Sequence, residues 1–170
     1  INIINLSKKN KVQKFIFASS SSVYGDQKKF PLNEKTKVFP KNIYSATKKI
    51  NEDIGEDISK ISSMKIIGLR FFTVYGKYGR PDMFIYKYLE SLINKKRFNL
   101  FNSGNHLRDY THIDDVVKIM DLLISKKMSK KFEIFNICSN KPIDINKLSL
   151  FIAKFLGKKP KFVFKDRNKI

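Results

Sequence analysis

The sequence is nearly empty of the residues that cross-link a chain or hold a metal. Its 170 residues include one cysteine, Cys138, so no disulfide can form within the chain. Its two histidines do not have the spacing of a metal-binding pair. We therefore expect a protein of a reducing compartment, the cytoplasm, without a metal site.

A long apolar run and an export leader are also missing. No apolar stretch approaches the roughly 20 residues that a membrane span requires. The first residues do not follow the charged-then-apolar order of a signal peptide. We expect neither a membrane span nor export.

Acidic residues are scarce, with 15 Asp and Glu against 35 Lys and Arg and a net charge of +20. Such a charge would suit a nucleic-acid partner, because clustered cations release counterions from a phosphate backbone. The lysines are instead spread over every segment, and no nucleic-acid-binding motif accompanies them. We expect no nucleic-acid partner, although a polyanion-binding module stays open as a second class of function.

The chain does contain an alternation of strand and helix patterns. Runs rich in β-branched and aromatic residues predict strands at 14–19, 65–72, 98–101, 132–138 and 161–164. A helix is predicted over about 42–61, because apolar residues step by three and four along one stripe. That stripe consists of Ile43, Thr47, Ile50, Ile54, Ile58 and Ile61.

Three further helices are predicted from their first turns. Pro81 suits a first helical position. Thr111 and Asp114 form a capping box before the next apolar pattern, and Asp144 is placed to cap the last helix.

Strands that alternate with helices indicate βαβ units and a mostly parallel sheet, whose ligands collect beyond the carboxyl ends of the strands. A doubly wound sheet opens with a strand and a glycine-rich turn, yet the seven glycines never form G-x-G-x-x-G or a P-loop. We predict an α/β fold, the C-terminal half of a Rossmann-type doubly wound parallel sheet plus part of a smaller substrate domain. The chain is then an internal piece of a longer protein.

Tyr44 and Lys48 form a candidate catalytic pair. They are four residues apart, so that phenol and ammonium lie on the same face of the predicted helix. A free phenol titrates near 10, and a cation about 5 Å away favours the phenolate by roughly 3 kcal/mol at an effective dielectric of 20. Tyr24 and Lys28 share the spacing, but Tyr24 lies in a turn whereas Tyr44 opens a helix.

Four ordered segments make the chain resemble a known family. They read "FIFASSSSVYG" at 15–25, "IYSATKK" at 43–49, "GLRFFTVYGKYGRPDM" at 68–83 and "RDYTHIDDVV" at 108–117. In this order they resemble the extended short-chain dehydrogenase/reductase family. Within it, the chain is most similar to the NAD-dependent nucleotide-sugar epimerases of the UDP-glucuronate 4-epimerase type.

The resemblance implies a catalytic set of Ser20, Tyr44 and Lys48 with NAD as cofactor. Tyr44 would remove the proton of the sugar 4-hydroxyl while NAD takes the hydride from C4 of a UDP-sugar. The 4-keto sugar would turn over, and the hydride would return to its other face. Ser20 would hydrogen-bond the reacting oxygen, and Lys48 would hold the nicotinamide ribose.

The resemblance also implies binding residues beyond this set. Phe72 and Thr73 match positions that line the nicotinamide and the sugar. The nucleotide-diphosphate region would comprise Asn99, Leu100, Phe101 and Arg108, of which the arginine pairs with phosphate oxygens. Phe72 and Phe101 could equally be core residues, and Arg108 could pair with Asp109.

The serine run bears on the substrate. Family dehydratases and decarboxylases carry an acidic residue where this chain has Ser22, which favours simple epimerisation here. Ser21, Ser22 and Thr73 can donate hydrogen bonds to a C5 carboxylate, and Arg80 belongs to "GRPDM", which looks typical of uronate epimerases. We expect interconversion of UDP-glucuronate and UDP-galacturonate, with a UDP-glucose 4-epimerase or another extended-family enzyme as the alternative.

The same resemblance suggests a division of the chain. Residues 1–76 would be the second half of the NAD-binding Rossmann domain. Residues 77–170 would be a substrate-binding region, interleaved with a returning Rossmann strand at about 132–138. We expect the full-length protein to be a homodimer and this chain alone, without the cofactor loop, to be inactive. A catalytically dead scaffold that keeps the fold is a further alternative.

Overall fold

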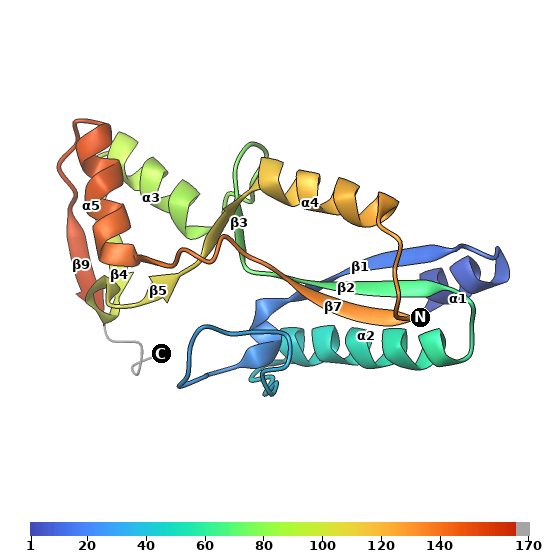
Figure 1. Ribbon diagram of the computed structural model, residues 1–170. Helices are drawn as coiled ribbons and strands as arrows, with labels where there is room; N and C mark the ends of the chain where they lie inside the picture. The colour runs from blue at the N-terminus through green and yellow to red at the C-terminus, as the bar shows by residue number, and fades with distance from the viewer. Residues whose placement is uncertain (166–170) are drawn as a thin grey trace. The chain divides into compact units, whose positions relative to one another are not determined.

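The computed structural model describes residues 1–165, which belong to two compact units (Figure 1). The first unit contains Ile1–Val74 and Thr111–Cys138, and the second contains Tyr75–Tyr110 and residues 139–165. Each unit is therefore assembled from two separate stretches of sequence, and the chain passes from one unit to the other three times.

A three-stranded parallel sheet forms the centre of the first unit. Its strands are β1 (Lys14–Ser20), β2 (Lys65–Phe71) and β7 (Phe132–Ile137), in the order β1-β2-β7. Helix α2 (Ile43–Lys60) lies on one face and α4 (Ile113–Ser125) on the other (Figure 1). The predicted parallel α/β arrangement is confirmed.

The two faces of β2 belong to different hydrophobic clusters. Ile67 and Leu69 pack with Val116 and Leu123 of α4. Ile66 packs on the opposite side, where α2 and helix α1 (Asn2–Lys9) contribute apolar side chains. Successive side chains of a strand point to opposite faces, so a strand covered on both sides is apolar throughout.

Helix α2 forms where it was predicted, but of its isoleucine stripe only Ile54 and Ile58 pack against the sheet. Ile43 and Ile50 are 85% and 53% exposed. The residues that α2 buries are Ser45, Glu52, Gly55 and Ser59. The small residues Ser45, Gly55 and Ser59 allow the helix to lie close to the strands: a Cβ on Gly55 would lie 3.2 Å from the ring of Phe17.

The N-cap of helix α4 is one residue later in the chain than the predicted cap, Thr111. Its N-cap is His112, whose Nδ1 accepts a hydrogen bond from the backbone N–H of Asp114 at 3.3 Å. Thr111 is instead buried in the short strand β6 (Tyr110–His112), which pairs with β3 (Thr73–Tyr75).

In the second unit, two helices pack together with two short strands. Helices α3 (Phe84–Ile93) and α5 (Ile145–Phe155) share a cluster with β4 (Phe98–Phe101) and β9 (Phe162–Lys165), which pair in parallel. Strands β5 (Leu107–Arg108) and β8 (Ile143–Asp144) pair antiparallel. Helix α3 starts three residues after Pro81, whereas Asp144 caps α5 as predicted.

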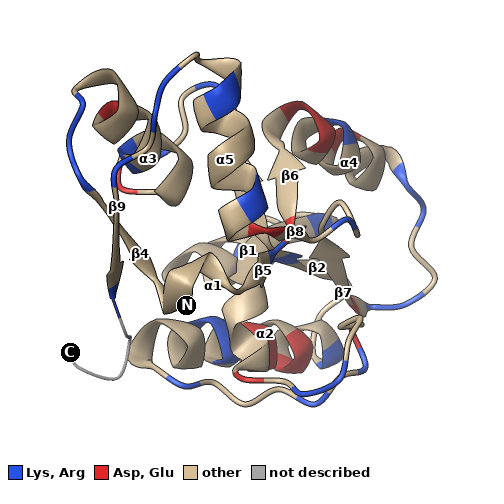
Figure 2. Ribbon diagram, turned by 90° about the vertical axis from the view of Figure 1, so that its left-hand side faces the viewer, with Lys and Arg blue, Asp and Glu red and all other residues tan. Residues whose placement is uncertain are grey.

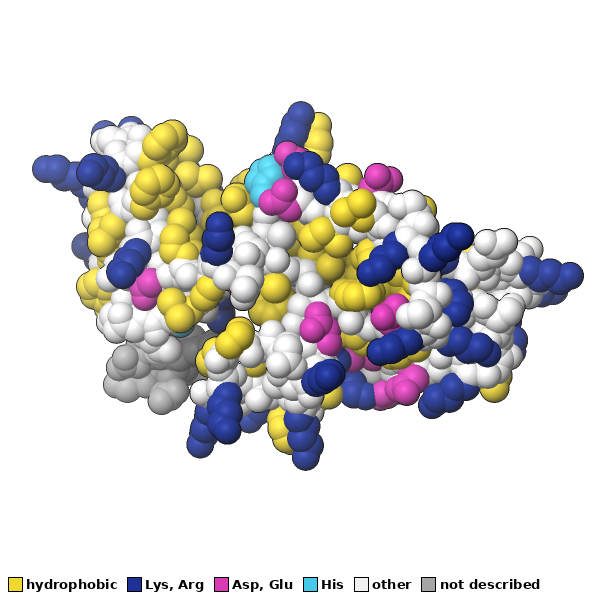
Figure 3. Space-filling model, viewed as in Figure 1, with side chains coloured by type: hydrophobic (Ala, Val, Ile, Leu, Met, Phe, Trp, Pro, Cys, Tyr) yellow, Lys and Arg dark blue, Asp and Glu magenta, His cyan; other side chains and the backbone are white. Residues whose placement is uncertain are grey.

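Charged residues are distributed over both units. Lys and Arg positions lie on helices and connecting loops throughout (Figure 2), and on the face drawn in Figure 3 they are interspersed with acidic and uncharged side chains. Among residues 1–165, no helix is long and apolar enough to cross a membrane.

Candidate active site

The four serines at the end of β1 have different environments. Ser19 is buried and donates to Oε1 of Glu52 at 2.5 Å. Ser20 ends the strand and caps the short 3₁₀ helix η1 (Ser21–Tyr24). Its Oγ accepts hydrogen bonds from the backbone N–H of Ser22 at 3.2 Å and from the Ser22 hydroxyl at 2.9 Å. Ser21 is half-buried. The strand end therefore presents a fixed Ser20 hydroxyl.

The first turns of α2 lie against this strand end. A reciprocal capping box between Asn42 and Ser45 starts the helix. Lys48, one turn later, donates to the carbonyl oxygen of Ala18 at 2.9 Å, and its Nζ lies 5.6 Å from the ring centroid of Tyr44. Lys48 thus contacts both the tyrosine ring and the backbone two residues before Ser20.

The ring of Tyr44 is open to a ligand, since the residue is 57% exposed. Tyr24 is fully buried, and its hydroxyl donates to Asn136 Oδ1 at 2.7 Å and accepts from Arg70. Burial raises the pKa of the Tyr24 phenol. Lys28 lies in the exposed loop after η1 and not on a helix with Tyr24. Tyr44 and Lys48 therefore share a helix and the tyrosine is exposed, whereas Tyr24 is buried and does not share a helix with Lys28.

Phe72 and Thr73 follow β2 at its carboxyl end. The Phe72 ring lies 6.5 Å from that of Tyr24, and its backbone N–H donates to the carbonyl of Ile137 at 3.1 Å. Both residues are half-buried. They share the carboxyl edge of the sheet with Ser20, as the sequence predicts for ligand-binding residues of a parallel sheet.

The remaining predicted residues belong to the second unit. Leu100 is buried in β4, so only its backbone could reach a ligand, whereas its neighbour Asn99 is exposed and Phe101 half-buried. Arg108 is exposed, and its guanidinium donates to the carbonyl of Leu107 at 3.4 Å. The Asp109 carboxylate accepts hydrogen bonds from Ser139 and Lys141.

Arg80 lies in the turn before α3 and makes a two-pronged ion pair with Asp82. Nε donates to Oδ1 at 3.0 Å, and Nη2 donates to Oδ2 at 2.5 Å. The guanidinium beside it lowers the pKa of the Asp82 carboxyl. The charge of Arg80 is therefore balanced locally by an exposed carboxylate.

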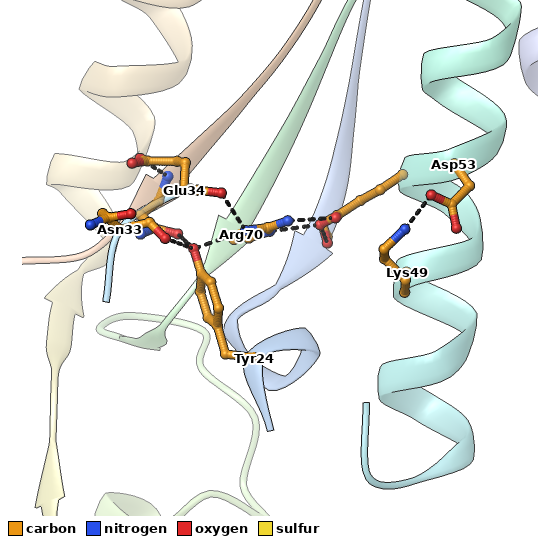
Figure 4. A network of polar contacts seen from close by, with 9 residues as sticks. Tyr24, Asn33, Glu34, Lys49, Asp53 and Arg70 are labelled. Carbon is orange, nitrogen blue, oxygen red and sulfur yellow. Dashed lines mark hydrogen bonds and ion pairs between the residues drawn. The ribbon is translucent and has the colours of Figure 1, made fainter. Parts of the chain in front are cut away.

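Sequence reasoning missed a buried polar network behind the strand end. Arg70 donates to both carboxylate oxygens of Glu52. Its Nη1 donates to the Tyr24 hydroxyl (Figure 4). An arginine inside the apolar strand "KIIGLRF" and an asparagine inside "FEIFNI" were the available signals. Charged groups are seldom fully buried unless they are paired.

Comparison with known proteins places these features in a class. Over residues 1–138 the sequence matches the NAD dependent epimerase/dehydratase family. UDP-glucuronate 4-epimerase 5 of Arabidopsis thaliana is 36% identical over 177 residues, which cover 95% of this chain and 41% of that protein. The uncharacterized protein MJ1055 of Methanocaldococcus jannaschii is 39% identical over 165 residues, which cover 96% of this chain and 50% of that protein.

A solved structure agrees with this match. UDP-glucuronic acid 4-epimerase from Bacillus cereus, in complex with NAD, superposes with a TM-score of 0.91 at 29% identity, covering 97% of this chain and 53% of that chain. The parallel sheet between helices is thus the Rossmann-type fold of these nucleotide-sugar enzymes. The chain belongs to the NAD dependent epimerase/dehydratase family, and it spans about half the length of the curated relatives it matches.

Proposed function

We propose that the full-length protein is an isomerase, an NAD-dependent nucleotide-sugar 4-epimerase that interconverts UDP-glucuronate and UDP-galacturonate. The observation that carries the proposal is the contact of Lys48 with both the Tyr44 ring and the Ala18 carbonyl, next to Ser20. The similarity to UDP-glucuronate 4-epimerases supports the choice of sugar. In this proposal the first unit binds NAD and the second binds the nucleotide sugar.

The residues at this edge fit NAD. Lys48 uses one of its three N–H donors in the hydrogen bond to the Ala18 carbonyl. The other two can donate to the hydroxyls of the nicotinamide ribose. Phe72 directly follows β2 on the same edge and would offer an aromatic surface to the nicotinamide. When bound, NAD would supply reversible hydride transfer at C4 of the sugar.

Tyr44 and Ser20 handle the proton of the sugar 4-hydroxyl. Tyr44 accepts this proton and returns it at the end of the cycle, and the ammonium of Lys48 lies 5.6 Å from the centre of its ring. Both hydrogen bonds that Ser20 Oγ accepts come from Ser22, so its own proton remains available for the reacting oxygen. Ser20 thus acts as a donor and Tyr44 as the base.

The substrate carboxylate and diphosphate are assigned to further side chains. Ser21 and Thr73 hold the C5 carboxylate as neutral donors, and Arg80 is an additional donor. The Ser22 hydroxyl already donates to Ser20, so Ser22 contributes by holding Ser20 in place. Because Arg80 is paired with Asp82, the hydroxyls of Ser21 and Thr73 provide most of the hydrogen bonding to the carboxylate in this proposal. The diphosphate region comprises Asn99, the Leu100 backbone, Phe101 and Arg108.

The test compares kcat/KM of the full-length enzyme for UDP-glucuronate and UDP-glucose under identical conditions. We expect UDP-glucuronate to be preferred by several powers of ten, because a site built for a polar group rejects a substrate that lacks it. Ser21→Ala and Thr73→Ala should reduce this ratio. If UDP-glucose turns over equally well and neither change alters the ratio, the enzyme is a neutral UDP-hexose epimerase. Salt-sensitive binding of nucleic acid without turnover of either sugar would support the polyanion-binding module instead.

A further inference from the structure

A row of polar side chains crosses the sheet of the first unit just before its carboxyl edge. Ser19, Arg70 and Asn136 occupy matching positions in the register of β1, β2 and β7, so they lie side by side on one face. Glu52 reaches the same row from α2, since it contacts both Ser19 and Arg70. These polar groups replace the apolar packing that the rest of this face shows.

The centre of the row is a buried ion pair. Arg70 and Glu52 are 5% and 4% exposed. Nε and Nη2 of Arg70 donate to the two carboxylate oxygens at 2.9 and 2.7 Å. Replacing a buried pair by apolar residues of similar volume is often neutral or stabilising, because desolvation offsets the mutual attraction. Stability alone therefore gives little reason for the pair.

The remaining donors of the network hold the segment between η1 and α2. Nη1 of Arg70 donates to the Tyr24 hydroxyl at 2.9 Å and to the Glu34 carbonyl at 3.3 Å. The Tyr24 hydroxyl, which donates to Asn136 Oδ1 at 2.7 Å, also lies 3.1 Å from the carbonyl oxygen of Asn33 (Figure 4). Asn136 Nδ2 donates to the carbonyl of Leu32. One guanidinium thus anchors the loop that joins the serine run to Tyr44.

Each end of the network is adjacent to a proposed catalytic group. Ser19 directly precedes Ser20, and its hydroxyl donates to Glu52. Glu52 follows Lys48 by four residues, one turn further along the same helix. The pair therefore connects the strand end that carries Ser20 to the helix that carries Tyr44 and Lys48.

We propose that Glu52 and Arg70 are positioning residues that preset the distance between the Ser20 hydroxyl and the Tyr44 phenol. This inference rests on the proposed function of these groups. Neither Glu52 nor Arg70 touches the sugar or the cofactor; both act through the β1 end, the loop and α2. A displacement of about 1 Å between reacting groups is enough to lower a rate by about 100-fold.

Two variants of the full-length enzyme test the proposal. Arg70→Lys keeps the charge but loses the two-pronged contact, and the double variant E52Q/R70M removes both charges together, so that no lone charge stays buried. Both should bind UDP-glucuronate with nearly unchanged KM and show kcat lowered by about 10- to 100-fold. Leu123→Ala is the control, because it opens the core on the α4 face and touches no member of the network.

The readouts separate positioning from general stability. A purely structural loss, as in Leu123→Ala, should lower the melting temperature while kcat stays close to that of the wild type. The two network variants should instead lose kcat even when it is measured well below their melting temperatures. E52Q/R70M with kcat within twofold of the wild type would overturn the proposal.

Hydrogen exchange of residues 20–47 gives a second readout that does not depend on turnover. The double variant should exchange faster there than Leu123→Ala does. Unchanged exchange in the double variant would overturn the positioning role, whether or not the wild type turns over a UDP-sugar. Absence of UDP-sugar turnover in the wild type would by itself reject only the proposed function.

Discussion

At the scale of single residues, the two tyrosines that precede a lysine by four positions have opposite environments. Tyr44 is exposed on α2 and faces the Lys48 ammonium, whereas Tyr24 is buried and its hydroxyl is occupied by Arg70 and Asn136. Loss of a positioned general base typically lowers a rate by about 10² to 10⁴-fold. The environment of the two rings, and not the spacing to lysine, is therefore the reason for proposing Tyr44 as the base.

We expect Tyr44→Phe in the full-length enzyme to abolish detectable epimerisation while the protein stays folded, because only the proton acceptor is removed. Tyr24→Phe should keep measurable turnover, since the Tyr24 hydroxyl touches no substrate in the proposed site. Steady-state rates and circular dichroism of both variants check this. Wild-type turnover in Tyr44→Phe, or equal damage from both changes, would contradict the assignment of the base.

The residues that sequence could identify are those within short local motifs. Ser20, Tyr44 and Lys48 stand in runs that can be recognised without a fold, and the structure places Lys48 against both Tyr44 and β1. The Glu52–Arg70 contact joins residues 18 positions apart on different elements. Nothing local to either residue specifies its partner, because the contact exists only once helix and sheet have packed.

At the scale of elements, the start of α2 controls where Tyr44 lies. Asn42 accepts from the backbone N–H of Ser45, and the Ser45 hydroxyl accepts from that of Asn42 at 3.1 Å. Tyr44 sits inside this first turn, so fraying of the turn would move its phenol. Asp144 caps α5 in the second unit in a similar manner, accepting from Lys147 at 2.9 Å.

Asn42→Ala and Asp144→Ala should therefore each cost about 1 kcal/mol of stability, the usual effect of losing an N-cap. Only Asn42→Ala should also lower kcat, because α5 carries none of the proposed catalytic groups. Urea denaturation and steady-state kinetics of the pair measure both effects. Equal losses of kcat in the two variants would show that capping acts through overall stability.

The long strands and α2 were predictable because their patterns extend over many residues. The strands β3, β5, β6 and β8 have only two or three residues each, too few for any alternation to be read. The stripe on α2 correctly predicted the helix, but only Ile54 and Ile58 of the stripe pack against the sheet. Apolar periodicity locates an apolar face, whereas the sheet accepts the small face around Gly55, which leaves Ile43 and Ile50 exposed.

At the scale of the whole molecule, these exposed isoleucines bear on the oligomeric state. Ile43, Thr47 and Ile50 step by four and three along the outer side of α2, and all three are exposed. Contiguous exposed apolar residues often mark interfaces. We propose that α2 contributes to the contact between two copies of the full-length protein.

The double change I43E/I50E should convert the full-length protein from dimer to monomer, because it introduces charges into an apolar contact. Phe155→Glu serves as the control, since Phe155 is equally apolar and 80% exposed but lies on α5 in the second unit. Light scattering coupled to size-exclusion chromatography gives the mass of each variant. A wild-type mass that matches the monomer would reject the homodimer itself.

The connections of the second unit have a consequence for folding kinetics. The Tyr75 and Tyr110 rings meet edge to face at 6.0 Å, and Asp109 holds the backbone of Ser139 and Lys141. All three points where the chain enters or leaves this unit are thus tied to one another. For a flexible stretch as long as Tyr75–Tyr110, bringing the ends together would cost about 3 kcal/mol in chain entropy. Once the second unit has folded, the ends of this stretch are already close together. The packing of α4 on β2 then requires little further loss of chain entropy, as for two elements joined by a short turn.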